Sequence, residues 1–164
     1  MTSPSPLPLH HIGVCVSDIE AAVKWYSQVF GYRVFTGPVL LDIDNDPRGQ
    51  LRDVLGPKFR KLKIAHLSTG GGCGLELFEP IDPPFERPEE DVEFWRAGPF
   101  HFCVMDPDIE GLIARIAATG GRQLSKIWDD RPPSNMRMAY CQDPFGTLIE
   151  IHTHSYEIVQ GWRS

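Results

Sequence analysis

The chain has 164 residues, of which 41% are hydrophobic and 23% are charged, a balance typical of a soluble domain with a packed core. Its formal net charge of −6 argues against nucleic acid and anionic membranes as partners. No apolar run reaches the roughly 20 residues that span a bilayer, and the N-terminus lacks the features of a signal peptide. The four cysteines show no Cys-x-x-Cys spacing, so we expect reduced thiols in a cytoplasmic protein.

The first half of the chain predicts a strand, a helix and then several further strands. Residues 9–16 have the composition of a short strand. Ser17 and Glu20 have the spacing of a helix-capping box, and apolar residues at helical spacing follow as far as Gly31. The remaining expected elements are a strand at 32–35, a short helix at 50–55, and two strands at 61–68 and 75–79 around a glycine-rich turn.

The second half repeats this arrangement at an offset of 90 residues. The shift superimposes His11 on His101, Asp18 on Asp108, and Gly31 on Gly121. A shared histidine, helix start and helix end at one offset indicate an internal duplication. We expect the second helix to be capped by Asp106, because Pro107 suits a first helical turn.

These elements predict an α+β fold built from two tandem βαβββ modules. The modules span residues 9–80 and 100–154, and a linker rich in proline and acidic residues, 81–99, joins them. A disordered N-terminal tail (1–8) and a C-terminal tail (155–164) complete the predicted organisation.

Each predicted module has two strands that carry one metal-competent side chain among aliphatic neighbours. The four residues are His11, Glu76, His101 and Glu150. Because successive strand side chains point to opposite faces, each lies opposite residues that can pack on a helix. One such residue alone is commonly a solvated surface group. Four of them at equivalent positions of a duplicated unit favour a divalent-metal site, with neutral imidazoles and ionised carboxylates as ligands.

Four segments resemble the signature strands of the vicinal oxygen chelate superfamily, which includes glyoxalase I, methylmalonyl-CoA epimerase, extradiol dioxygenases, and bleomycin and fosfomycin resistance proteins. The segments are residues 11–20, 75–80, 100–104 and 143–151. The resemblance covers residues 9–154 as one domain. It implies that the paired modules form a half-open, metal-binding mixed β-barrel of the glyoxalase/bleomycin resistance/dioxygenase type. It also implies a small-molecule substrate and a homodimer.

Carried over by position, the resemblance places the metal ligands at His11, Glu76, His101 and Glu150. In extradiol dioxygenases the metal ligands are a triad of two histidines and one carboxylate, which leaves coordination positions open for oxygen. Here all four positions hold good ligands, which is more similar to the glyoxalase and epimerase branch. The ligand set suits one divalent ion and does not distinguish zinc, nickel, cobalt, manganese or iron.

We therefore predict a metal-dependent lyase or isomerase of the glyoxalase I type, acting on a small oxygenated substrate. A metal-polarised carbonyl makes the adjacent C–H acidic, and a metal-bound glutamate shuttles the proton through an enediolate. Glu76 and Glu150 are the candidate bases, with Glu150 favoured. Two alternatives stay open: an epimerase of a carbonyl or thioester substrate, and a non-catalytic drug-binding or resistance protein without a metal.

Three neighbouring residues are weaker candidates. Strand alternation predicts that Glu79 and His10 face away from the ligands. His152 shares the face of Glu150, where it is either a substrate contact or a solvated strand end.

Overall fold

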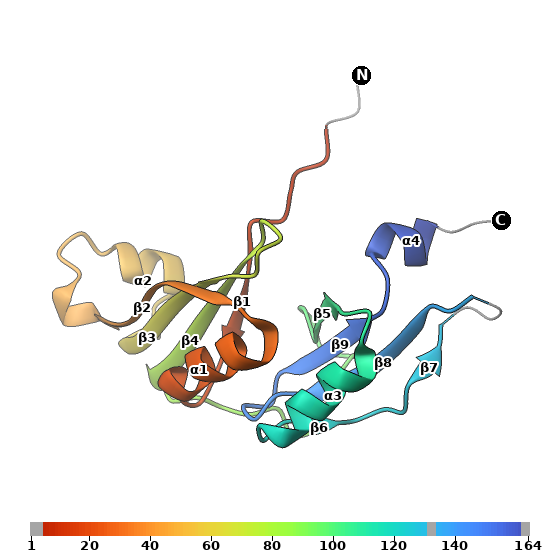
Figure 1. The fold of residues 1–164 in the computed structure, drawn as a ribbon. Coiled ribbons are helices and arrows are strands. Elements are labelled where there is room, and N and C mark those ends of the chain that lie inside the picture. The colour runs from red at the N-terminus through yellow and green to blue at the C-terminus, as the bar shows by residue number, and fades with distance from the viewer. Residues whose placement is uncertain (1–4, 131–133, 162–164) are drawn as a thin grey trace. The chain divides into compact units, whose positions relative to one another are not determined.

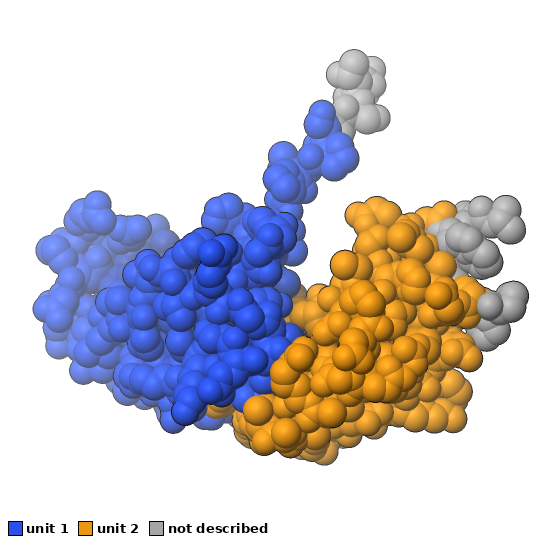
Figure 2. Space-filling model, in the orientation of Figure 1, with its two compact units in different colours: residues 1–85 blue, residues 86–164 orange. Residues whose placement is uncertain are grey.

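The computed structural model describes residues 5–130 and 134–161. Residues 1–4 of the predicted disordered tail and 162–164 of the predicted C-terminal tail lie outside the described residues. The chain forms two compact units, Met1–Phe85 and Glu86–Ser164, which Figure 2 shows in different colours. None of the described helices is both long and apolar enough to cross a membrane.

The first unit is a four-stranded mixed sheet whose order is β1-β4-β3-β2. β1 (His11–Cys15) runs parallel to β4 (Gly74–Asp82), whereas β3 (Lys61–Ser68) is antiparallel to both β4 and β2 (Arg33–Asp42). Helix α1 (Ile19–Phe30) connects β1 to β2 and packs on the sheet (Figure 1). The 3-10 helix η1 (Ile43–Asn45) and α2 (Gln50–Leu55) lie between β2 and β3.

The second unit repeats this plan with the strand order β5-β9-β8-β6. β5 (Phe102–Met105) runs parallel to β9 (Leu148–His152), and β9 is antiparallel to β8 (Arg137–Gln142). β8 also pairs with the two-residue strands β6 (Arg122–Gln123) and β7 (Trp128–Asp129). Helix α3 (Ile109–Ala118) connects β5 to β6, and α4 (Tyr156–Gly161) follows β9. The predicted α+β fold with two tandem βαβββ modules is therefore confirmed.

The core of each unit lies between its sheet and its long helix. Leu75 and Leu77 of β4, and Ile149 and Ile151 of β9, are at most 2% exposed. Glu76 and Glu150 alternate with them and are half-buried on the opposite face. This division of each strand into an aliphatic and a polar face agrees with the alternation predicted from the sequence.

The helix caps differ from those predicted. The α1 cap is Asp18, whose Oδ1 accepts from the Ala21 backbone N–H at 2.9 Å, and the predicted capping box of Ser17 and Glu20 is wrong. The α3 cap is Asp108 rather than Asp106. An aspartate carboxylate accepts well from the free backbone N–H groups of a first helical turn. Asp18 and Asp108 are also equivalent at the 90-residue offset, so the duplication extends to the caps.

Two elements extend beyond the predicted boundaries. The strand expected at 32–35 continues to Asp42 as β2, with irregular register on β3. Helix α4 forms where the sequence indicates only a tail, and Val159 anchors it at 2% exposure. The four cysteines, all within the described residues, are free thiols.

Candidate metal centre

The first candidate pair, His11 and Glu76, lies on the adjacent parallel strands β1 and β4. Glu76 is paired with Gly13, so His11 lies two residues before the residue opposite the carboxylate. His11 Nε2 is 3.3 Å from Glu76 Oε2. Parallel pairing of the first and last strands of the module therefore brings together two residues that are far apart in the sequence.

The second candidate pair, His101 and Glu150, repeats this geometry. Glu150 is paired with Cys103 across β5 and β9, and His101 again lies two residues earlier. His101 Nε2 is 3.1 Å from Glu150 Oε2. The second pair is more enclosed, with the two side chains 23% and 16% exposed, against 43% and 21% in the first pair. The structure thus brings each predicted histidine to its predicted glutamate, each pair within one unit.

Each glutamate also contacts a second histidine through its other oxygen. His66 Nδ1 lies 3.2 Å from Glu76 Oε1, and His152 Nε2 lies 3.3 Å from Glu150 Oε1. The sequence singles out His152 only as a weak candidate and does not single out His66. The register of the β3–β4 hairpin would have identified His66, because it pairs His66 with Glu76.

The two pairs differ in their neighbours. Tyr140 of β8 is paired with Glu150, where His66 stands opposite Glu76 in the first unit. Burial, followed by the charge of Glu150, raises the pKa of the Tyr140 hydroxyl to about 12. Desolvation and the same carboxylate raise the pKa of the Cys103 thiol to about 12. Cys103 is exposed overall, and the Glu150 carboxylate opposes a second negative charge beside it. Both groups are therefore protonated near neutral pH.

Glu79 lies as strand alternation predicts, whereas His10, which precedes β1, contacts His11. Glu79 Oε2 accepts from the Ile19 backbone N–H at 3.0 Å, so its side chain faces α1. Its carboxylate and that of Glu20 both pair with Lys63 Nζ, at 3.3 and 3.0 Å. Oxygens of Asp18, Glu20 and Glu79 lie within 4.8 Å of one another, but the lysine ammonium already supplies the cation for this group. His10 is exposed and contacts His11 through Nδ1.

Within each pair, the donor atoms of the histidine and the glutamate have a separation that fits ligation of a common divalent ion. Two ligands that are each about 2.1 Å from an ion lie roughly 3.0–3.4 Å apart at octahedral or tetrahedral angles. The separations of 3.3 and 3.1 Å fall in this interval, which also suits an imidazole–carboxylate hydrogen bond. His101 Nδ1 is buried without a partner among the described residues. Ligation through Nε2 requires the ring proton on Nδ1, which is then a buried donor without a partner. The attraction between the ion and the carboxylates must offset the free-energy cost of burying that donor.

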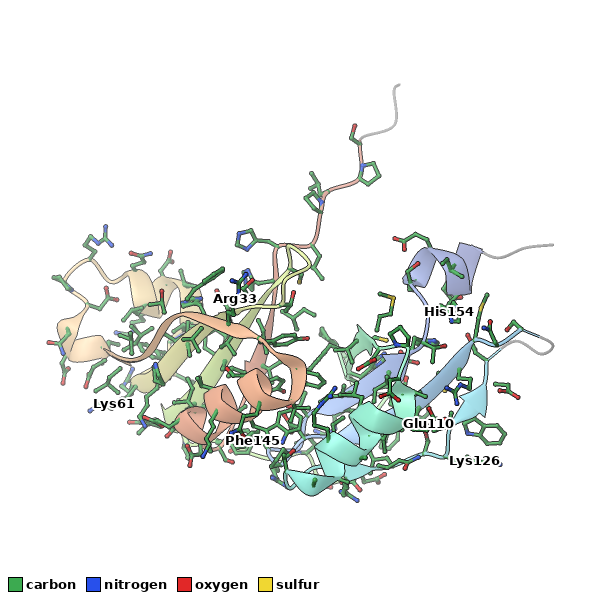
Figure 3. All side chains as sticks on the ribbon, in the orientation of Figure 1. Arg33, Lys61, Glu110, Lys126, Phe145 and His154 are labelled. Carbon is green, nitrogen blue, oxygen red and sulfur yellow. The ribbon has the colours of Figure 1, made fainter. Side chains whose placement is uncertain are left out.

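A pocket of about 380 Å³ lies beside the second pair. His101, Glu150 and His152 line it, together with Val104 and Met105 of β5. His154, Tyr156 and Gln160, from the segment that follows β9, line it as well. Figure 3 labels His154 close to helix α4.

Comparisons with known proteins agree with this architecture. The family model of the Glyoxalase/Bleomycin resistance protein/Dioxygenase superfamily matches residues 8–151. A 2-epi-5-epi-valiolone epimerase from Actinomyces sp. is 24% identical over 151 residues, which cover 90% of this chain and 80% of that protein.

Two solved structures show the same fold at low sequence identity. A glyoxalase family protein from Bacillus cereus has a TM-score of 0.70 at 17% identity, covering 93% of this chain and 97% of that one. The fosfomycin resistance protein FosX from Listeria monocytogenes, complexed with Mn(II) and 1S,2S-dihydroxypropylphosphonic acid, has a TM-score of 0.60 at 15% identity, covering 93% and 94%. With the family model matching most of the chain, the protein belongs to the glyoxalase/bleomycin resistance protein/dioxygenase superfamily, also called the vicinal oxygen chelate superfamily.

Proposed function

We propose that this protein is a metal-dependent isomerase that moves a proton on carbon next to a carbonyl group. The observation that carries the proposal is the recurrence of one histidine–glutamate pair at equivalent register positions of two modules. Its ligands for one divalent ion are His11, Glu76, His101 and Glu150. Two neutral nitrogens and two carboxylates suit zinc, nickel, cobalt, manganese or iron. The FosX complex with Mn(II) supports a metal in this fold.

The proposed chemistry divides the work between the ion and the glutamates. When bound, a divalent ion polarises the carbonyl of the substrate and lowers the pKa of the adjacent C–H. A glutamate carboxylate then takes the proton from carbon and returns it. Protonation of the opposite face of the same carbon, which needs a second proton donor on that face, is an epimerisation, whereas return of the proton by the same carboxylate to the neighbouring carbon is an isomerisation of the glyoxalase I type.

Glu150 is the favoured base. Its side chain lines the pocket of about 380 Å³, so a small molecule there lies beside the carboxylate. His152 and His101 hold its two oxygens at 3.3 and 3.1 Å, which orients the group before substrate binds. Glu76 has the equivalent position in the first unit and is the second candidate.

Epimerisation of a carbonyl compound is the first specific candidate, because the curated relative at 24% identity is named as an epimerase. A lyase or isomerase reaction of the glyoxalase I type is the second candidate, favoured by the same four-ligand set. The superfamily resemblance also supports a homodimer, which light scattering of the purified protein would test.

The proposal is tested by proton exchange in D₂O. The protein is loaded with each candidate metal, and hydroxylated ketones are followed by NMR for replacement of the hydrogen next to the carbonyl. We expect exchange in the wild type and a loss of about 100-fold or more in Glu150→Gln. Glu79→Gln is the matched control, because Glu79 faces α1, and it should exchange like the wild type.

Circular dichroism of each variant shows whether the fold is retained. Exchange that is unchanged in both Glu76→Gln and Glu150→Gln would contradict the proposed roles. Ligand binding without exchange for any metal would instead indicate a non-catalytic binding protein on the same fold.

A further inference from the structure

We propose that the Cys103 thiol is a further ligand of the divalent ion, supplied by the second unit alone, and that it favours zinc over manganese at this centre. The inference rests on the proposed function, because it adds a ligand to the same centre and narrows the choice of metal. The place of Cys103 on its strand, the donor atoms around it, and a difference between the two units support it.

Strand register places Cys103 beside the candidate base. Cys103 of β5 is paired with Glu150 of β9 and lies two residues after His101, so the three side chains share the polar face of the sheet. All three line the pocket of about 380 Å³. Cys103 is an exposed, free thiol. Its sulfur is therefore open to an ion that His101 and Glu150 bind.

The donor atoms around this thiol are close to one another. One ligand atom from each of Cys103, Glu150 and His152 lies within 4.8 Å of the other two. Sulfur and oxygen ligands of one zinc ion are roughly 3.1–3.6 Å apart at octahedral to tetrahedral angles, which rotation of an exposed cysteine side chain can reach. His152 already contacts Glu150 Oε1 at 3.3 Å. Cys103 is thus the donor of this group that has no part in the arrangement described so far.

The first unit has no thiol at the equivalent position. Gly13 is paired with Glu76 as Cys103 is paired with Glu150. A Cβ atom at Gly13 would lie 3.2 Å from the ring of Phe78, which therefore covers the place of a side chain there. Phe78 in turn stands two residues after Glu76, where the second unit has a histidine after its glutamate. A glycine and a phenylalanine in one unit thus correspond to two metal-competent residues in the other.

A thiolate ligand changes which ion the centre prefers. Thiolates select soft ions such as zinc, whereas carboxylate and water ligands suit manganese. Ligation replaces the S–H bond of Cys103 by a bond from sulfur to the ion, and the proton passes to solvent. While Glu150 takes the substrate proton, Cys103 and His101 continue to hold the ion from the second unit. Cys103 therefore narrows the range of metals and frees Glu150 to act as a base.

X-ray absorption spectroscopy of the zinc-loaded protein tests the ligand directly. We expect a sulfur neighbour at about 2.3 Å from zinc in the wild type, beside nitrogen and oxygen neighbours at about 2.0–2.1 Å, and no sulfur neighbour in Cys103→Ala. Cys15→Ala and Cys73→Ala are the matched controls, because both thiols lie in the first unit and outside the donor group. Both controls should keep the sulfur neighbour. Circular dichroism shows whether each variant retains the fold.

Metal affinity gives the second measurement, by competition with a chromophoric chelator. Loss of a direct ligand should lower zinc affinity by at least about tenfold in Cys103→Ala, whereas manganese affinity should change by less than about twofold. Cys103→Ser, which keeps the size of the side chain but lacks the soft sulfur, should lose zinc affinity like the alanine variant.

Three results would overturn the inference: no sulfur neighbour in the zinc-loaded wild type, a sulfur neighbour that persists in Cys103→Ala, or equal losses of zinc and manganese affinity. Deuterium exchange, measured in parallel, separates this inference from the proposed function. Exchange in a protein whose zinc has no sulfur neighbour rejects the thiol ligand and leaves the isomerase. A sulfur neighbour that is lost in Cys103→Ala, without exchange for any metal, supports the thiol ligand and rejects the isomerase.

Discussion

Glu150 and His152, two residues apart on β9, contact each other through their side chains, with His152 Nε2 3.3 Å from Glu150 Oε1. The His152 ring is only 13% exposed, and its Nδ1 is buried without a partner among the described residues. A proton on Nε2 lets the ring donate a hydrogen bond to the carboxylate. His152 thus binds one oxygen of Glu150 and leaves the other towards His101.

Replacing His152 should weaken metal binding without removing a proposed ligand. In His152→Phe the Oε1 atom of Glu150 loses its imidazole partner. Phenylalanine is chosen because the equivalent position of the first unit, two residues after Glu76, is Phe78. Loss of such an outer partner typically lowers metal affinity by roughly 10- to 100-fold. Competition with a chromophoric chelator measures the affinity. His152→Asn, which keeps a donor, should recover part of the loss, whereas equal affinities in all three proteins would show that His152 does not position Glu150.

Removing a proposed histidine ligand should remove the metal. Elemental analysis of protein purified without chelators should find about one transition-metal ion per chain in the wild type. It should find much less in His101→Ala and His11→Ala. Glu79→Gln is the control, since the Glu79 carboxylate faces α1 and accepts from the Ile19 backbone N–H. Full metal content in both ligand variants would reject the proposed ligand set.

Removing either aspartate cap should destabilise the protein. Asp18→Ala leaves the Ala21 N–H without its carboxylate acceptor, and Asp108→Ala does the same to Gly111. Each change should lower the free energy of unfolding by about 1 kcal/mol in urea titrations. Ser17→Ala, at the wrongly predicted cap, should change it by less than about 0.5 kcal/mol. A larger loss for Ser17→Ala than for Asp18→Ala would contradict the observed cap.

Stability should fall at alkaline pH partly because of Cys141. This thiol of β8 is fully buried, and burial raises its pKa from 9.0 to about 11. Between these values the unfolded chain has lost a proton that the folded chain retains, so rising pH favours unfolding. Below pH 9 the thiol is protonated in both states and its stabilising effect is fully present. At pH 10 the free energy of unfolding is lower by about 1.4 kcal/mol.

Urea titrations at pH 8 and pH 10 on the wild type and Cys141→Ala measure this loss. The variant starts lower, because the substitution leaves a small cavity. Its stability should nevertheless fall less between the two pH values than that of the wild type. Equal falls in the two proteins would show that the Cys141 thiol does not titrate in this way.

Alternating strand faces made the candidate pairs predictable from the sequence. A carboxylate between two aliphatic residues, as at Glu76 and Glu150, defines which face is buried and which is polar. The 90-residue repeat then supplied the equivalence of His11 and His101. Neither inference needs the three-dimensional arrangement, because both depend only on chain periodicity.

The features that the sequence did not reveal depend on register or on tertiary contact. His66 faces Glu76 only in one hairpin register, and the glycine-rich turn between β3 and β4 does not specify that register. Helix α4 has six residues, too few to be stable alone, and depends on the burial of Val159. Ser17 and Asp18 are both good capping residues, so local sequence did not distinguish them.

The parallel pairings β1·β4 and β5·β9 also determine when each candidate pair can form during folding. Each joins the first strand of a module to its last, and is the most distant strand pairing in sequence among the described strands of its unit. Closing so long a loop is entropically costly, and the helix and hairpin between the strands involve shorter loops. Each histidine should therefore meet its glutamate late, after most of its module has formed. An ion that binds there stabilises contacts absent from early intermediates, so it should slow unfolding more than it accelerates folding.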